Sequence, residues 1–209
     1  YLSTTLLSFT AFGFVLMEAL ITYFGTGRHL FYTAAQFHRL EQLFGALFLF
    51  TVPLFFHYLL ELPKGLKRIT QWLSICGLAF ALISLVTAFT APQLFISTEE
   101  VTTRLGPEIG QAGRGKEGFV YNVRDILLAV YLLTIIVLTA VDMVRNRRVK
   151  YLLMIVIGLL AAAFFAADDI IHIYTNVHIG FFREDSYPRF PLGITIFLIL
   201  TMTSVLRKF

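Results

Sequence analysis

The sequence has little charge and a single cysteine. Only 14% of its 209 residues are charged, 57% are hydrophobic and the mean hydropathy is +0.77, whereas about a quarter of the residues in a typical soluble domain are charged. The lone Cys76 excludes an intrachain disulfide. Neither a serine nucleophile elbow nor an HExxH zinc motif occurs. These absences argue against a soluble, disulfide-stabilised or hydrolytic protein and indicate a membrane protein.

Long apolar runs make up most of the chain. A helix that spans lipid needs about 20 apolar residues, and six runs approach or exceed that length. The last is the shortest, but Pro191 fits its first turn, and Arg207 and Lys208 can reach the headgroups from its end. We therefore expect one domain over residues 1–209, an all-α polytopic membrane helix bundle. Its expected spans are Leu2–Phe24, Leu43–Leu62, Thr70–Ala91, Phe119–Met143, Tyr151–Tyr174 and Leu192–Leu206.

Basic residues are concentrated in two short loops and the C-terminal tail. The turns Pro63–Ile69 and Val144–Lys150 contain lysine and arginine but no acid, whereas the longer loops contain both signs of charge. The positive-inside rule places the basic loops and the C-terminus in the cytoplasm. We therefore expect a multi-pass membrane protein with its C-terminus on the cytoplasmic side. The net charge of +4 fits loops that face anionic headgroups, so the expected partner is the lipid bilayer and not a nucleic acid.

Both ends of the chain lie in or beside apolar sequence. Tyr1 is not a methionine and leads directly into the first run, and the last run ends just before Phe209. We expect six spans in this chain, and the full bundle has seven if one more span precedes Tyr1 and six otherwise. We also expect a cytoplasmic output domain after Phe209.

Ionisable residues interrupt the apolar spans near their expected outer ends. The segment AADDIIHIY, from Ala166 to Tyr174, places Asp168 and Asp169 about a turn and a half inside the outer end of the fifth span, and His172 follows at i+4 and i+3. Counting from the tight turn near Arg147 places other charged residues at the same depth. Charges in a membrane cost several kcal/mol unless they pair or are hydrated, which makes them candidates for function. The candidate ligand-binding residues are Glu18, Tyr121, Arg124, Asp125, Asp168, Asp169 and His172.

Three interpretations of this polar layer are open. Arg124 can neutralise one of the two aspartates in a structural ion pair. The layer can instead form an outward-opening pocket for a small ligand, a proton or an ion, because two adjacent carboxylates do not both ionise easily in a low dielectric. A metal site is disfavoured, since Asp168 and Asp169 point about 100 degrees apart on a helix and no third histidine is near. We therefore assign no residue as a metal ligand, and the sequence does not indicate which cofactor, if any, the protein binds.

The other histidines and one glycine-rich segment give weaker signals. His57 has Glu61 at i+4 and can bond to that acid or to a backbone carbonyl, so we interpret it as a packing residue. A bis-histidine haem is disfavoured because His57 and His172 fall in opposite leaflets. The segment GRGKEG, Gly113–Gly118, matches a dinucleotide pattern but precedes a membrane span, so we interpret it as a flexible loop end. The histidines assigned to outer loops are His29, His38 and His178.

The chain also resembles a family of signalling proteins. The segments that carry the likeness are RLEQLFGALFLFTVPLFFHYLLELP, TAPQLFIS, GFVYNVRDILLAVYLLTIIVLTAVDMVRNRRVKYLLMIVIGLL and PLGITIFLILTMTSVLRKF. In apolar texture and loop rhythm they are similar to the N-terminal seven-helix sensor region of bacterial histidine kinases and related receptors. The likeness implies a non-catalytic sensor domain in the plasma membrane, which is the inner membrane of a bacterium. It also implies a homodimer through the full-length receptor and an attached kinase, cyclase or phosphatase. It supplies no ligand-binding residues.

We therefore expect a transmembrane receptor domain that detects an extracytoplasmic or membrane-borne small ligand, an ion or pH. Closing Arg124 between Asp168 and Glu18 would draw three spans together and relay a helix movement to the cytoplasmic output. The alternatives are a membrane-embedded enzyme or proton/ion carrier that uses the acid cluster, and a structural assembly subunit. The candidate relay residues are the kink point Pro53, His57 and Leu206.

Overall fold

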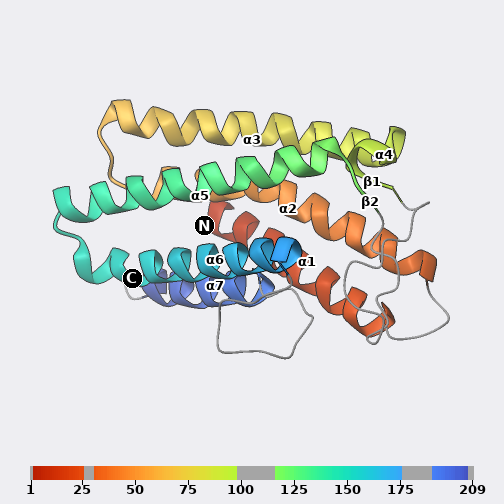
Figure 1. Ribbon diagram of the computed structural model, residues 1–209. Coiled ribbons are helices and arrows are strands. Elements are labelled where there is room, and N and C mark those ends of the chain that lie inside the picture. The colour runs from red at the N-terminus through yellow and green to blue at the C-terminus, as the bar shows by residue number, and fades with distance from the viewer. Residues whose placement is uncertain (1, 26–30, 98–115, 176–189, 207–209) are drawn as a thin grey trace.

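The computed structural model describes residues 2–25, 31–97, 116–175 and 190–206, which form a bundle of helices (Figure 1). This arrangement confirms the expected all-α polytopic helix bundle. A short helix and a small antiparallel sheet, in which β1 pairs with β2, join two of the long helices. The elements are α1 (Leu2–Gly25), α2 (Phe31–Leu59), α3 (Lys64–Thr90), α4 (Pro92–Phe95), β1 (Ile96–Ser97), β2 (Lys116–Glu117), α5 (Phe119–Arg145), α6 (Val149–Thr175) and α7 (Phe190–Leu206).

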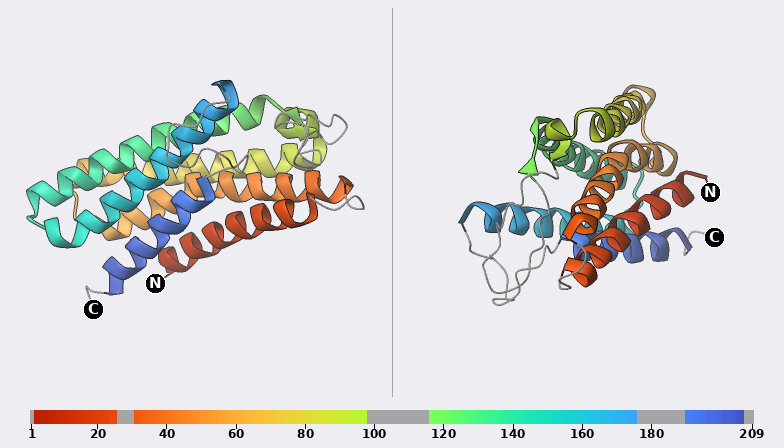
Figure 2. Two further views of the ribbon diagram at one scale, coloured as in Figure 1. Left: turned by 60° about the horizontal axis from the view of Figure 1, so that its bottom comes forward. Right: turned by 90° about the vertical axis from the view of Figure 1, so that its right-hand side faces the viewer.

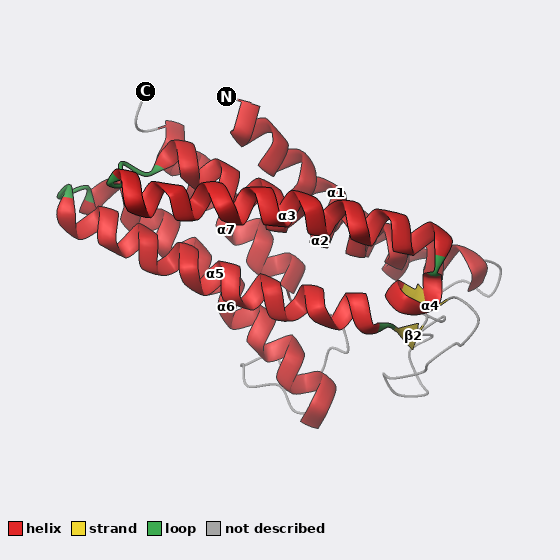
Figure 3. Cartoon of the chain, turned by 90° about the horizontal axis from the view of Figure 1, so that it is seen from above, coloured by secondary structure: helices red, strands yellow, loops and turns green. Residues whose placement is uncertain are grey.

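Five helices of the described chain are long and apolar enough to cross a membrane, namely α1, α2, α3, α5 and α6. The sixth expected span corresponds to α7, an apolar helix of 17 residues. The turn between α2 and α3 and the turn between α5 and α6 lie at one end of the bundle. The sheet and α4 lie at the opposite end (Figure 3). We call these the turn end and the sheet end.

The start of α2 differs from the prediction. The helix begins at Phe31 and not near Leu43, so His38 and Glu41 lie in a helix and not in an outer loop. At 29 residues, α2 is about 43 Å long, which exceeds the roughly 30 Å of a hydrocarbon core. The prediction was wrong because it looked for apolar residues, whereas this part of the helix buries the polar His38, Glu41 and Gln42.

The segment before α5 also differs from a flexible loop end. Lys116 and Glu117 form β2, and Gly118 N donates a 2.8 Å hydrogen bond to Phe95 O at the end of α4. A side chain at Gly118 would collide with the backbone of Leu94, so the close approach requires glycine. Residues 113–115 of the glycine-rich segment lie outside the described residues.

Two pairs of neighbouring helices approach each other closely at glycines. A Cβ atom on Gly77 of α3 would lie 1.9 Å from Leu49 O of α2, and a Cβ atom on Gly158 of α6 would lie 2.9 Å from Phe197 Cα of α7. Small residues at helix interfaces permit such packing in membranes. Figure 2 shows α1 beside α2 and α7 beside α6. The buried face of α3 consists of Thr70, Ser74, Gly77, Ala81, Ser84 and Ala88.

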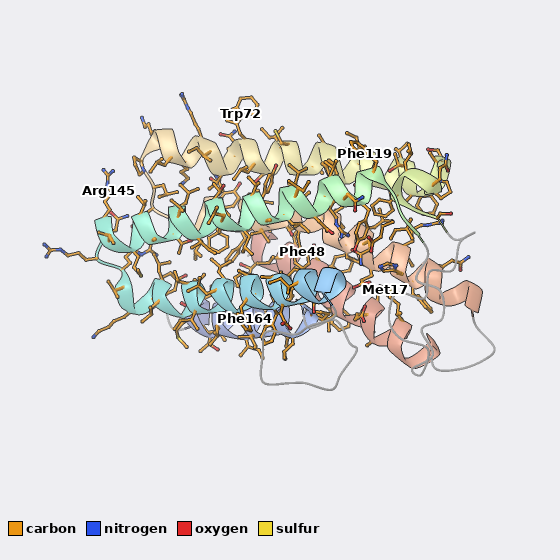
Figure 4. The ribbon with its side chains drawn as sticks, viewed as in Figure 1. Met17, Phe48, Trp72, Phe119, Arg145 and Phe164 are labelled. Atoms are coloured by element: carbon orange, nitrogen blue, oxygen red, sulfur yellow. The ribbon has the colours of Figure 1, made fainter. Side chains whose placement is uncertain are left out.

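Aromatic and aliphatic side chains fill the middle of the bundle. Phe56 of α2 stacks on Phe197 of α7 with ring centroids 6.5 Å apart, and Phe14 of α1 contacts Phe48 of α2 at 5.9 Å. Large apolar side chains such as Trp72 and Phe164 point outward (Figure 4). An apolar exterior over an apolar core fits a helix bundle surrounded by lipid.

Candidate functional site

Arg124 forms a buried bridge between α5 and α2 near the sheet end. The residue is 3% exposed. Its Nε donates a 3.0 Å hydrogen bond to Asp125 Oδ1, and its Nη1 bonds to the side chain of Gln42 and lies 3.4 Å from Gln42 O. Its Cζ lies 4.1 Å from the ring centroid of Tyr121, a cation–π contact. The guanidinium is therefore held by one ion pair, one neighbouring helix and one aromatic face.

Three buried polar residues of α2 continue this network. Gln42 Nε2 donates a 3.0 Å hydrogen bond to Glu41 Oε2, which lies 3.9 Å from His38 Nε2. The His38 ring contacts Tyr121 edge-on with centroids 6.4 Å apart. The polar contacts thus extend from α5 along α2. We call this set the Arg124 cluster, and its members are His38, Glu41, Gln42, Tyr121, Arg124 and Asp125.

Helical spacing explains how α2 presents this set. His38, Glu41, Gln42 and Gly45 are separated by three, one and three residues, so they share one face of the helix. A Cβ atom on Gly45 would lie 3.1 Å from Arg124 Nη1. The missing side chain at Gly45 thus lets the guanidinium lie against α2. Hydrogen bonds and an opposite charge offset the desolvation of a buried arginine, which is otherwise expensive.

Asp169 of α6 is separated from the Arg124 cluster by an aromatic contact. Phe14 of α1 lies near Gly45, and its ring meets Phe190 of α7 edge-on with centroids 5.6 Å apart. Phe190 N donates a 2.7 Å hydrogen bond to Asp169 Oδ2. Asp169 therefore caps the first residue of α7, where backbone N–H groups have no partner within the helix. This contact gives Asp169 a structural role.

The structure brings together only part of the predicted polar layer. Tyr121, Arg124 and Asp125 lie in one cluster, but the ion-pair partner of Arg124 among the described side chains is Asp125, and not Asp168 or Asp169. The interpretation in which Arg124 neutralises Asp168 or Asp169 was wrong, because counting residues fixes depth along a helix but not the direction in which a side chain points. The other predicted site residues are Glu18, Asp168 and His172. Glu18 and Asp168 are buried, and the side chain of His172 is outside the part of the chain that the structure describes.

The predicted relay residues have different surroundings. His57 Nδ1 lies 3.0 Å from Thr70 Oγ1 of α3, and not against Glu61 as one interpretation proposed. This contact links α2 to α3 near the turn end. Pro53 is buried inside α2, and Leu206 is exposed at the last position of α7.

A second polar cluster lies at the turn end and was missed by sequence reasoning. Arg148 Nη1 lies 3.2 Å from Glu61 Oε1 and 3.3 Å from Asp142 Oδ2, and Asp142 is fully buried. Asn146 Nδ2 donates a 2.9 Å hydrogen bond to Glu61 O and another to the Asp142 carboxylate. A lone acid in an apolar span, six residues before an arginine, was the available signal. We call Glu61, Asp142, Asn146 and Arg148 the Arg148 cluster.

Comparison of the chain with protein-family models, curated proteins and solved structures finds no match. The resemblance to histidine-kinase sensor regions therefore stays a prediction. Among the described residues, no three His, Cys, Asp or Glu side chains lie close enough together to hold a metal ion. The site is therefore characterised by its own geometry.

The Arg124 cluster contains hydrogen-bond donors and acceptors but no evident nucleophile. Its side chains include a guanidinium, an amide, an imidazole and two carboxylates, which both donate and accept hydrogen bonds. The side chain of Asp125 is 41% exposed, whereas that of Arg124 is 4% exposed. Of the two members of this ion pair, Asp125 is therefore the more accessible from outside the bundle.

Proposed function

We propose that this chain is a transmembrane sensory domain that detects a small polar ligand, an ion or a change in pH at its sheet end. The observation that carries the proposal is the position of α5. Arg124 and Asp142 lie eighteen residues apart on this helix, which is about five turns, so they share one face about 27 Å apart. Each belongs to a polar cluster that contacts α2 or the turn that follows it.

The contacts of α5 suggest how binding becomes movement. At the sheet end, the hydrogen bonds from Arg124 to Gln42 hold α5 against α2. A ligand shifts this arrangement only if it binds one state more tightly than the other. A ligand that takes Asp125 or Gln42 away from Arg124 has that unequal affinity. The resulting shift of α5 reaches Asp142, whose carboxylate contacts the turn before α6.

The apolar middle of the bundle favours a receptor over an ion carrier. Between the two clusters, the buried face of α5 presents Tyr131, Ile135, Leu138 and Thr139. The Thr139 hydroxyl already donates to the carbonyl of Ile135. A carrier needs polar groups or water along the path of the ion, because an unpaired charge in hydrocarbon is costly. A receptor needs only a rigid helix between its two ends.

The charge distribution supports an orientation for this receptor. We propose that the basic turn end, with the end of α7, faces the cytoplasm of a bacterium and that the sheet end faces outward. An output domain after Phe209 and a homodimer through the full-length protein complete the proposal. A helix shift at the turn end would then occur on the cytoplasmic side of the membrane, where the proposed output domain lies.

Distance measurements between spin labels test this proposal. In a Cys76→Ser background in nanodiscs, labels at the exposed Val144 of α5 and Ile69 of α3 report the turn end. We expect Arg124→Gln to shift or broaden that distance by about 1–2 Å, the size of helix shifts in known switches. The control is Asn122→Ala, an exposed residue in the same region of α5. An unchanged distance in Arg124→Gln would overturn the relay.

Proton flux into proteoliposomes tests the carrier alternative. A pH-sensitive dye inside the vesicles reports flux after an external pH jump. We expect flux no faster than in protein-free liposomes. Flux that requires the protein and is lost in Glu41→Gln would favour a carrier and contradict the receptor.

A further inference from the structure

We infer that the turn end carries a binding surface for the headgroups of anionic phospholipids in the surrounding bilayer. The surface combines the first turns of α3 with the connection between α5 and α6. This inference concerns the other end of the bundle from the Arg124 cluster and does not depend on the sensory proposal. We call it the basic surface, and its residues are Lys64, Lys67, Arg68, Arg145, Arg147 and Lys150.

Direct contacts join the turn before α3 to the connection between α5 and α6, and the six cations lie in or beside these two segments. Asn146 Nδ2 donates a 2.9 Å hydrogen bond to Glu61 O, and Arg148 Nη1 lies 3.2 Å from Glu61 Oε1. Arg148 thus belongs to the interior of this junction and not to the basic surface. The contacts of Glu61 with Asn146 and Arg148 hold the two connections together, so the cations on either side of these contacts form one surface. Figure 1 shows both turns at the same end of the bundle.

The charges of the basic surface are not neutralised within the described part of the chain. Among the described residues, none of the six cations takes part in an ion pair, and the neighbouring acids, Glu61 before α3 and Asp142 of α5, are held by Arg148. Five of the six are exposed, and Lys67 is half-buried. A group of unpaired cations beside a membrane attracts anionic headgroups.

The backbone at Arg147 gives an independent reason to assign a ligand. Its φ is 51°, the one positive value at a non-glycine residue in the described chain. Glycine or asparagine suits this left-handed conformation better than a long side chain does. Strained residues of this kind are often retained for function. At Arg147 the side chain is exposed and unpaired, so its charge is the property that an external partner can use.

The neighbouring aromatic residue places the basic surface at the depth of the headgroups. Trp72 lies one turn after Arg68 on α3 and is 64% exposed. Tryptophan is enriched at the boundary between headgroups and hydrocarbon. Figure 4 shows Trp72 on the outside of α3, and Arg145 pointing away from the bundle at the turn end. The cations beyond Trp72 therefore lie level with lipid phosphates.

Lipid-dependent stability tests the inference. The whole chain is reconstituted in nanodiscs of phosphatidylcholine, alone or mixed with phosphatidylglycerol, and its Tm is measured. We expect phosphatidylglycerol to raise the Tm of the wild type by about 2–4 °C, the effect of a modest binding energy on a chain of this size. Native mass spectrometry should show phosphatidylglycerol retained preferentially over phosphatidylcholine.

Substitutions at Arg147 separate charge from backbone strain. Arg147→Gly relieves the left-handed conformation, so we expect its Tm in phosphatidylcholine to equal or exceed that of the wild type. Its gain from phosphatidylglycerol should fall, and Arg147→Lys should restore it. Combining Arg147→Gly with Lys67→Gln and Arg145→Gln should remove most of the gain. Gly65→Ala, with no atom within 4 Å of the added methyl group, is the control and should keep the full gain.

Two outcomes would overturn the inference. One is an unchanged phosphatidylglycerol effect in the triple variant that still folds in phosphatidylcholine. The other is an equal rise in Tm when inorganic phosphate is added to the phosphatidylcholine nanodiscs, which would assign the surface to free anions and not to lipid.

Discussion

Arg124 and Asp142 occupy the two ends of one buried face of α5, and each is held in a polar cluster that includes residues outside α5. Apolar side chains fill most of the face between them. A helix held at both ends in this way can move as a rod, because its backbone hydrogen bonds resist bending. The contacts at its two ends make α5 a direct physical link between the sheet end and the turn end.

Removing the guanidinium at Arg124 should destabilise the bundle. We expect Arg124→Gln to lower the free energy of unfolding by about 1–3 kcal/mol, because Gln42 loses its donor and Asp125 its ion pair. The loss should be smaller than for a fully buried pair, since the Asp125 side chain is 41% exposed. Unfolding by steric trapping measures it. A loss no larger than that of Asn122→Ala would show that these contacts contribute nothing.

The close approach of α2 and α3 should depend on Gly77. An added methyl group would lie 1.9 Å from Leu49 O, so Gly77→Ala must push the helices apart. We expect a loss of about 1–3 kcal/mol, typical of overpacking. Gly65→Ala in the same helix meets no atom within 4 Å and should be neutral or stabilising. Equal unfolding free energies for the two variants would contradict the close packing.

The buried Asp142 should contribute more to the free energy of unfolding than the exposed Glu61. Asp142→Ala leaves Arg148 and Asn146 without their buried acceptor, and we expect a loss of about 3–5 kcal/mol. In Glu61→Gln the altered side chain is 64% exposed in the wild type, so the loss should be about 0–1 kcal/mol. Urea or SDS titration of each variant compares them. The reverse order would mean that Glu61 is the main partner of Arg148.

Asp169 should act as a cap for α7. Asp169→Ala removes the acceptor for Phe190 N, and we expect a loss of about 0.5–2 kcal/mol. Hydrogen exchange should become faster in the first turn of α7, while Asp169→Asn, which keeps an acceptor oxygen, should retain most of the protection. Unchanged exchange in Asp169→Ala would reopen a ligand-binding role for this residue.

Sequence patterns predicted the helices because long apolar runs and basic turns are local properties. They also identified Arg124 as a membrane-embedded charge. They failed at His38, because a search for apolar windows started the helix at Leu43 and so left out the preceding turns, which contain buried polar residues. They failed again for the partner of Arg124, since depth does not determine which way Asp125 and Asp168 point.

Contacts between distant segments explain the other omissions. The pairing of Arg148 with Glu61 joins two turns that are far apart in the sequence, so a rule based on loop charge detected only the orientation signal. The approach of Gly77 to Leu49 depends on how two helices cross. Neither relationship is visible within a single segment of sequence.

A double-mutant cycle between Arg124→Gln and Arg148→Gln measures whether α5 couples the two ends of the bundle. The two residues lie in different clusters and share no partner in the described chain. Independent sites this far apart should be additive within about 0.3–0.5 kcal/mol. If α5 couples the two ends, the unfolding free energies of the single variants and the double variant should give an interaction energy of about 1 kcal/mol or more. Additivity within experimental error would contradict the coupling and leave the two clusters as separate structural supports.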